Sequence, residues 1–99
     1  MKIVAVTACP TGIAHTYMAA EQLEKTATAL GHQIKVETQG TMGIENELSA
    51  KDIREADVAV FAVDIEVERR ERFAGKRIVE VRVAEAIKNP KGVLERLHG

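Results

Sequence analysis

The only cysteine of the chain, Cys9, lies in a turn between an apolar run and the beginning of a helical pattern. The N-terminus of a helix leaves backbone N–H groups without internal partners, and the helix dipole adds about half a positive charge there. Both effects favour an anion, so they favour the thiolate form of a cysteine and also the binding of phosphate. We therefore expect Cys9 to be a nucleophile that can carry a phosphoryl group.

The residues after Cys9 suit the binding of phosphoryl oxygens. Gly12 allows the backbone to approach an oxyanion closely, and Pro10 stiffens the turn although it lacks an N–H. The predicted phosphoryl-binding loop, which includes two threonine hydroxyl donors, consists of Pro10, Thr11, Gly12, Ile13, Ala14, His15 and Thr16. From spacing alone, a lone cysteine can also be a small buried hydrophobic residue, and this interpretation stays open.

Other functions of a turn of this kind require particular residues, and the sequence shows whether they are present. A thioredoxin-like redox site needs a second cysteine at the position of Gly12, which excludes that chemistry. A cysteine phosphatase needs an arginine clamp for the phosphate at the position of His15. Asp64 could act as the general acid of hydrolysis, but the missing arginine disfavours a phosphatase. The glycine patterns of dinucleotide-binding and P-loop proteins are absent.

Residues at the ends of two further predicted strands form a possible rim of the site. Thr38, Gln39 and Gly40 close one strand, and Asp64 closes another. In open α/β sheets, ligands bind at the carboxyl ends of the strands, near the point where the strand order reverses. The same four residues could equally shape turns or solvated strand ends. His15 could donate to the phosphoryl group or favour the thiolate, or it could bond to backbone in the first helical turn.

The elements that must position these residues alternate between strands and helices over residues 1–99, which predicts one domain. Apolar runs rich in β-branched residues predict four strands, at 2–7, 34–38, 57–63 and 77–81. Because helical patterns separate or follow them, we expect an α/β fold with three layers. Its core is a four-stranded parallel sheet, order 2-1-3-4, flanked by helices.

Several local patterns refine this prediction. The first helix ends at Gly31, and its expected buried stripe is Tyr17, Ala20, Leu23, Ala27 and Leu30. Ser49 begins a capping box, and Asn89 with Pro90 ends one helix and begins another. Met18 is expected in the core, with a contact patch for a partner as the alternative. The charged stretch 66–72 is expected to be a solvated face, although its arginines, Arg69, Arg70 and Arg72, could meet an acidic partner.

Composition excludes several classes of function. The net charge of −1 and the few aromatic residues argue against a nucleic-acid partner. No apolar run approaches the roughly 20 residues that cross a bilayer, so we expect no membrane insertion. A single cysteine cannot form an internal disulfide, which is typical of the reducing cytoplasm. No cluster has metal-ligand spacing, and we expect neither a metal nor another cofactor.

The segment Cys9–Thr16 resembles the active-site loop of fructose-type enzyme IIB components of the bacterial sugar phosphotransferase system. The resemblance runs through nearly the whole chain, in Tyr17–Glu21, Val36–Gly40, Gly43, Ala62–Asp64, Arg72–Phe73 and Gly75–Lys76. It implies that Cys9 takes a phosphoryl group from a phosphohistidine of the IIA component. It implies further that the group passes to a sugar, fructose by default, held by the membrane component IIC.

The resemblance also implies a cytoplasmic location at the inner face of the membrane, reached through IIC. A regulatory or binding module of the same fold, without turnover, remains the alternative from another class.

Overall fold

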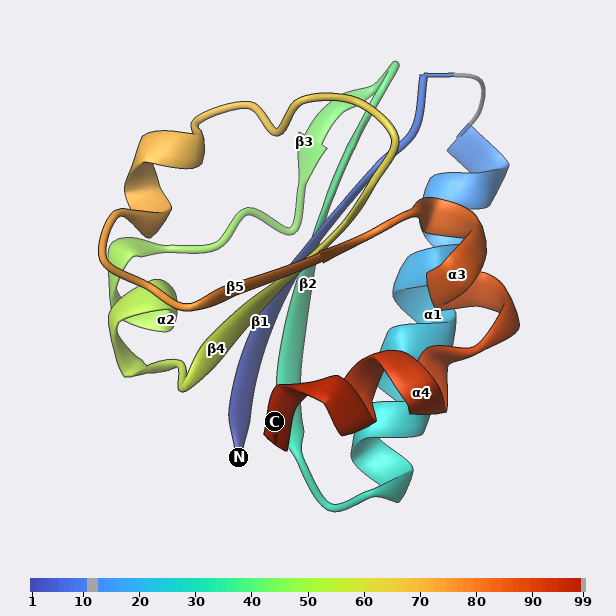
Figure 1. Ribbon diagram of the computed structural model, residues 1–99. Helices are drawn as coiled ribbons and strands as arrows, with labels where there is room; N and C mark the ends of the chain where they lie inside the picture. Colours follow the sequence, from blue (N-terminus) through green and yellow to red (C-terminus); the bar gives the residue numbers. More distant parts are fainter. Residues whose placement is uncertain (11–12, 99) are drawn as a thin grey trace.

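A computed structural model describes residues 1–10 and 13–98 and shows a mixed five-stranded sheet between two helical layers (Figure 1). The strands are β1 (Lys2–Ala8), β2 (Gln33–Gly40), β3 (Gly43–Glu45), β4 (Val58–Val63) and β5 (Ile78–Val81). Their order in the sheet is β3-β2-β1-β4-β5. The predicted α/β class is confirmed, and the four predicted strands lie in the predicted order.

The prediction of a purely four-stranded parallel sheet is wrong in one respect. β3 pairs antiparallel with β2, and Gly40 lies opposite Gly43 across a tight turn. The other three pairings, of β1 with β2, β1 with β4 and β4 with β5, are parallel. With three residues, β3 is too short to show the alternating pattern from which a strand is predicted.

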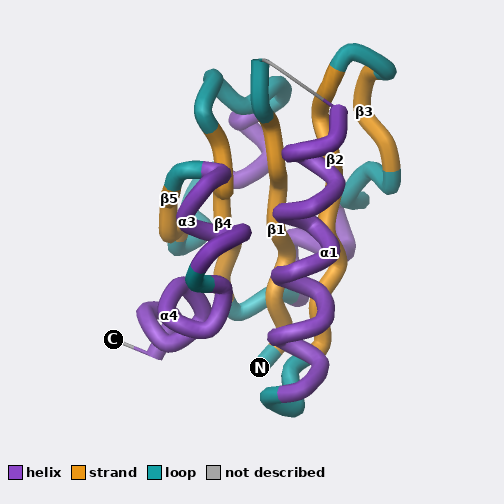
Figure 2. Tube along the Cα trace, turned by 90° about the vertical axis from the view of Figure 1, so that its right-hand side faces the viewer, coloured by secondary structure: helices purple, strands orange, loops and turns teal. Residues whose placement is uncertain are grey.

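The helices divide unequally between the two faces of the sheet. Figure 2 shows α1 (Ile13–Ala29), α3 (Val83–Lys88) and α4 (Pro90–Glu95) together on one face. The short η2 (Arg96–His98) continues α4. The opposite face carries α2 (Ala50–Glu55) and the 3₁₀ turn η1 (Arg70–Phe73).

Each face has its own hydrophobic core because alternate residues of a strand point to opposite sides. Ile3 and Ala5 of β1 pack under α1, α3 and α4, in a core that also contains Leu23 and Leu94. Val4 and Val6 pack on the other face against α2 and η1, around Phe61 and Phe73. These two aromatic rings meet edge to face, with 4.9 Å between their centroids. β1 is buried on both faces, as its continuous apolar run predicts.

The predicted helix ends are confirmed. Ser49 accepts a hydrogen bond from the N–H of Asp52, and the Asp52 carboxylate accepts one from the N–H of Ser49. Asn89 accepts from the N–H of Gly92 at the start of α4, with Pro90 in the first turn. Gly31 adopts a φ of +84° after α1, a conformation that glycine reaches without a steric penalty.

The predicted buried stripe of α1 is wrong at both ends. Ala20, Leu23 and Ala27 are buried, but Tyr17 and Leu30 are 40% and 43% exposed. Leu30 lies beyond the last residue of the helix, and the Tyr17 hydroxyl donates to Glu45 of β3. Thr16 and Ala19 complete the buried face instead. Met18 is 48% exposed, which corrects its expected place in the core.

Candidate functional site at the carboxyl edge of the sheet

Cys9 and Asp64 lie side by side because they follow two adjacent parallel strands. Ala8 pairs with Val63 in the register of β1 and β4, and each of the two residues comes one position later. The N–H of Asp64 donates to the carbonyl of Ala8 at 2.9 Å. The Cys9 Sγ then lies 3.9 Å from Asp64 Oδ2, and the cysteine is 6% exposed. The prediction that Asp64 shares an edge with Cys9 is confirmed.

A second pair of donors fixes the Asp64 carboxylate from its other side. Arg82 Nε donates to Oδ1 at 2.7 Å, and the N–H of Val83 donates to the same oxygen at 3.2 Å. The hydrogen bond from Arg82 is the main reason that the pKa of Asp64 is lowered, and burial only partly opposes it. Asp64 is therefore a carboxylate at neutral pH, which argues against the general-acid role that a phosphatase would need.

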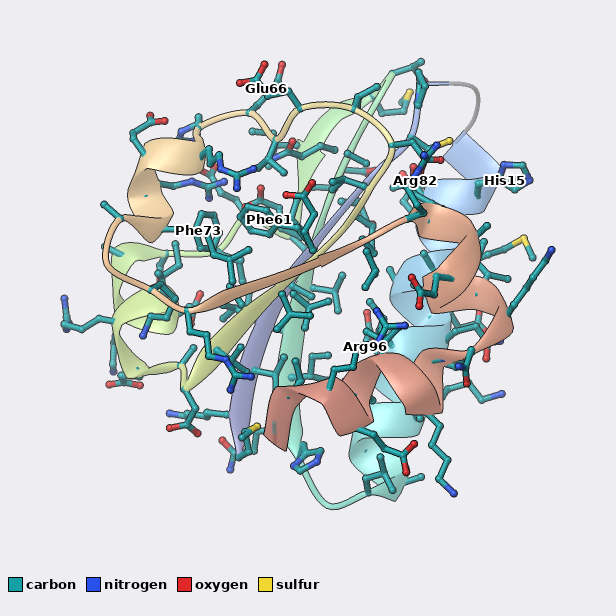
Figure 3. All side chains as sticks on the ribbon, in the orientation of Figure 1. His15, Phe61, Glu66, Phe73, Arg82 and Arg96 are labelled. Atoms are coloured by element: carbon teal, nitrogen blue, oxygen red, sulfur yellow. The ribbon has the colours of Figure 1, made fainter. Side chains whose placement is uncertain are left out.

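A pocket of about 400 Å³ opens beside the Cys9 sulfur. Its described lining is Cys9, His15, Met18, Asp64, Val83, Ala84, Ile87 and Lys88. The apolar wall comes from α1 and α3, while His15, Asp64 and Lys88 supply titratable groups. The stick view shows His15 at the beginning of α1, at the same end of the molecule as Arg82 (Figure 3). An exposed methionine beside a nucleophile suits adaptable apolar contact with a partner.

The predicted phosphoryl-binding loop is described only in part. Pro10, Ala14 and His15 are exposed, so they are accessible from solvent around Cys9. Thr16 is 2% exposed, and its carbonyl accepts a hydrogen bond from the Thr7 hydroxyl at 3.1 Å, which ties α1 to β1. The predicted roles of Thr11 and Gly12, and that of the Ile13 side chain, lie outside the described residues.

Thr38, Gln39 and Gly40 share the edge but are not among the described residues that line the Cys9 pocket. Thr38 and Gly40 border a small depression with Thr16 and Tyr17. The Gln39 side chain bonds instead to the backbone of Glu68. Its Oε1 accepts from the N–H at 2.9 Å and its Nε2 donates to the carbonyl at 3.1 Å.

The expectation that residues 66–72 form a solvated face is wrong for Arg72. Its side chain is 13% exposed and pairs with Glu37, whose side chain is fully buried. Arg69 and Arg70 are about half exposed, and each is paired, with Glu47 and Glu80 respectively. The alternative, that these three arginines meet an acidic partner surface, stays a prediction.

Sequence reasoning missed Arg82 as a site residue. No motif marks it, because it lies 73 positions after Cys9 and belongs to the turn between β5 and α3. The available signal was positional: Arg82 directly follows a predicted strand, at the edge where the other strand ends were expected.

Within the described ranges, no three His, Cys, Asp or Glu side chains are grouped so that they could hold a metal ion. The helices of these ranges are also too short or too polar to cross a membrane.

Comparison with known proteins agrees with this arrangement. A sequence profile of the family described as "PTS system, Lactose/Cellobiose specific IIB subunit" matches residues 4–96. The chain is 52% identical over 96 residues to the "PTS system fructose-like EIIB component 2" of Escherichia coli K12. That match covers 97% of this chain and 91% of the relative. It is also 50% identical over 95 residues to the fructose-specific EIIABC component of Bacillus subtilis, covering 96% of this chain and 15% of the relative.

Solved structures show the same fold. The solution structure of an enzyme IIB subunit of the phosphotransferase system from Escherichia coli K12 superposes with a TM-score of 0.92 at 42% identity. The superposition covers 98% of this chain and 90% of that one. Family, relatives and fold agree with the resemblance of the Cys9 loop, and the chain belongs to the fructose-like IIB components of the bacterial sugar phosphotransferase system.

Proposed function

We propose that Cys9 accepts a phosphoryl group from a phosphohistidine of a IIA component and passes it to a sugar bound by a membrane IIC component. The observation that carries this proposal is the place of the Cys9 sulfur, at the carboxyl edge of the sheet and at the wall of a pocket of about 400 Å³. A carrier needs a nucleophile that two partners can reach in turn. The exposed surface of Pro10, His15 and Met18 around the sulfur supports such access.

The chemistry is two in-line displacements at phosphorus. In the first, the Cys9 thiolate attacks, an S–P bond forms, and the P–N bond breaks with its electron pair returning to the imidazole of the donor. In the second, a sugar hydroxyl attacks, an O–P bond forms, and the pair of the S–P bond returns to sulfur. The hydroxyl proton leaves to a base of the acceptor site. The role of this chain is to position and stabilise the group between the two steps.

The partners are inferred from the relatives. Proteins named EIIBC and EIIABC contain a segment similar to this chain, which spans 20% and 15% of their length. Domains joined in one chain in those proteins are natural partners for this domain. Fructose is the first sugar to test because the relatives are named fructose-like or fructose-specific. The family profile names lactose and cellobiose, so these are the next sugars to test.

Intact mass spectrometry tests the proposal directly. The chain is incubated with phosphoenolpyruvate, the general phosphotransferase proteins and a fructose-type IIA component, beside a Cys9→Ala variant whose folding is checked by circular dichroism. We expect one added phosphoryl group on the wild type and none on the variant. Absence of the group on the wild type with several active donors would contradict the proposal and favour a regulatory module.

A further inference from the structure

Arg82 lies at an exposed position beside the Cys9 site. Its pairing with Asp64 occupies only part of its guanidinium group. It is the N-cap residue of α3, and its side chain is 77% exposed. Within the described chain, the side chain of Arg82 makes a single hydrogen bond, from Nε to Asp64 Oδ1. The two terminal nitrogens of the guanidinium group make no bond to the described residues, so the planar fork that suits phosphate is available.

Asp64 separates this arginine from the nucleophile. One carboxylate oxygen, Oδ1, accepts from Arg82, and the other, Oδ2, lies 3.9 Å from Cys9 Sγ. This arrangement is acceptable while Cys9 is a neutral thiol, which can donate weakly to the carboxylate. A phosphoryl group on the same sulfur would bring close to two negative charges next to Asp64, and like charges at this distance repel strongly.

A nearby positive charge can relieve this repulsion, and three basic side chains lie near Asp64. Two of them line the Cys9 pocket, and Arg82 lies in the neighbouring depression on the outer side of Asp64. His15 comes from α1 and Lys88 from α3, and both line the pocket with Asp64. Arg82 alone of the three is bonded to the carboxylate that touches the sulfur. Away from the Cys9 pocket, Asp64 and Arg82 line a second depression, together with Glu66, Arg70 and Glu80. Because an exposed ion pair contributes little stability, Arg82 loses little when it turns from one anion to another.

We propose that Arg82 is a ligand of the phosphoryl group on Cys9, moving from Asp64 to the phosphoryl oxygens when the group arrives and returning when it leaves. This inference rests on the proposed function. The displacement is the one written above and includes the loss of the thiol proton. The S–P bond forms as the P–N bond of the donor breaks, the donor imidazole takes up the proton from Cys9, and Arg82 neither gives nor takes one. Asp64 holds the arginine in place beside the empty thiol, so the ligand is ready before the group is transferred.

The test is a ³¹P NMR titration of the phosphorylated protein. Wild type, Arg82→Gln, Arg82→Lys and Asp64→Asn are phosphorylated by the same donor proteins. Arg96→Gln is the matched control, since Arg96 is also an exposed arginine paired with an acidic side chain, Glu85. It lies further along the helical layer, away from Arg82 (Figure 3).

A guanidinium ligand lowers the pKa of a phosphoryl group, and a nearby carboxylate raises it. We expect Arg82→Gln to raise the titration midpoint by roughly one pH unit or more, and Arg82→Lys to raise it less. Asp64→Asn should lower the midpoint, and Arg96→Gln should leave it unchanged. A pair in which Arg82 stays on Asp64 and never contacts the phosphoryl group predicts nearly the wild-type midpoint for Arg82→Gln, because an exposed charge that acts from a distance is screened by solvent.

The outcomes separate this inference from the proposed function. Phosphorylation of the wild type with equal midpoints in wild type and Arg82→Gln would overturn the role of Arg82 and leave the carrier function intact. Shifts in the same direction for Arg82→Gln and Asp64→Asn would also overturn it. Failure of the wild type to take up any phosphoryl group would overturn both.

Discussion

The buried carboxylate of Glu37 is held by both terminal nitrogens of Arg72, at 2.8 Å to Oε1 and 2.9 Å to Oε2. Two further donors complete its shell, the N–H of Leu48 at 2.9 Å and the Gln39 side chain at 2.8 Å. Burial raises the pKa of Glu37, but these bonds, with Arg72 the strongest, outweigh it and the net pKa is lowered. The network therefore connects β2 to the segment that runs from Asp64 to η1.

Replacing Arg72 by Leu should destabilise the fold strongly. The change leaves the fully buried Glu37 carboxylate without its charged partner, and losing one partner of a buried ion pair costs about 3–5 kcal/mol. Urea unfolding followed by circular dichroism measures the loss. Arg70→Leu is the control, since its pair with Glu80 is about half exposed on both sides and should contribute at most about 1 kcal/mol. Equal losses in the two variants would contradict the importance of burial here.

This network also shows what the sequence could and could not predict. The strands, the helix caps and the position of Cys9 follow from local patterns. A strand, a turn and a helix N-terminus each depend on residues that follow one another in the sequence. Glu37 with Arg72, and Asp64 with Arg82, are pairs between residues that lie 35 and 18 positions apart in the sequence, and nothing local marks a charged residue as buried. The sequence does not predict β3 for a related reason. Its three residues adopt a strand conformation only because they pair with β2.

Stability should fall on acidification as Asp52 becomes protonated. Its pKa is lowered from 3.8 to about 2, first by the hydrogen bond from Lys35 and then by the bonds to Ser49 in the cap of α2. Because the folded pKa lies below the unfolded one, the stabilisation is complete above about pH 4 and is lost as the pH falls toward 2. Urea unfolding of wild type and Asp52→Asn between pH 6 and pH 2 measures the effect.

In the Asp52→Asn variant, the free energy of unfolding should depend less on pH in this window than in the wild type. Glu37, whose pKa is lowered too, contributes a loss of the same sign in both proteins. Glu24→Gln, on the exposed side of α1, is the control and should follow the wild type. If the free energy of unfolding changed equally with pH in the wild type and in Asp52→Asn, the protonation of Asp52 would not contribute to the loss of stability in acid.

Gln39→Ala should loosen the segment after Asp64 without disturbing the sheet. Its side chain makes two bonds to the backbone of Glu68 and one to Glu37, and a net hydrogen bond is worth about 1 kcal/mol. Losing both bonds to Glu68 therefore costs more than the about 1.4 kcal/mol that corresponds to a tenfold change. We expect amide hydrogen exchange at Glu68 to become at least tenfold faster. Gln33→Ala, at the exposed start of β2, is the control. Unchanged exchange at Glu68 would mean that the Gln39 bonds do not hold this segment.

Gly92→Ala should destabilise the C-terminal helix through its neighbour Asn89. A Cβ on residue 92 would clash with Asn89 Nδ2 and would lie 2.9 Å from Oδ1, the atom that caps α4. The side chain must move away, and losing such a cap costs about 1 kcal/mol. In the background of Asn89→Ala the clash is absent, so the same substitution should there become neutral or stabilising, since alanine favours a helix over glycine. A double-mutant cycle by thermal unfolding measures this coupling, and additive effects of the two substitutions would show that Gly92 is not required by the cap.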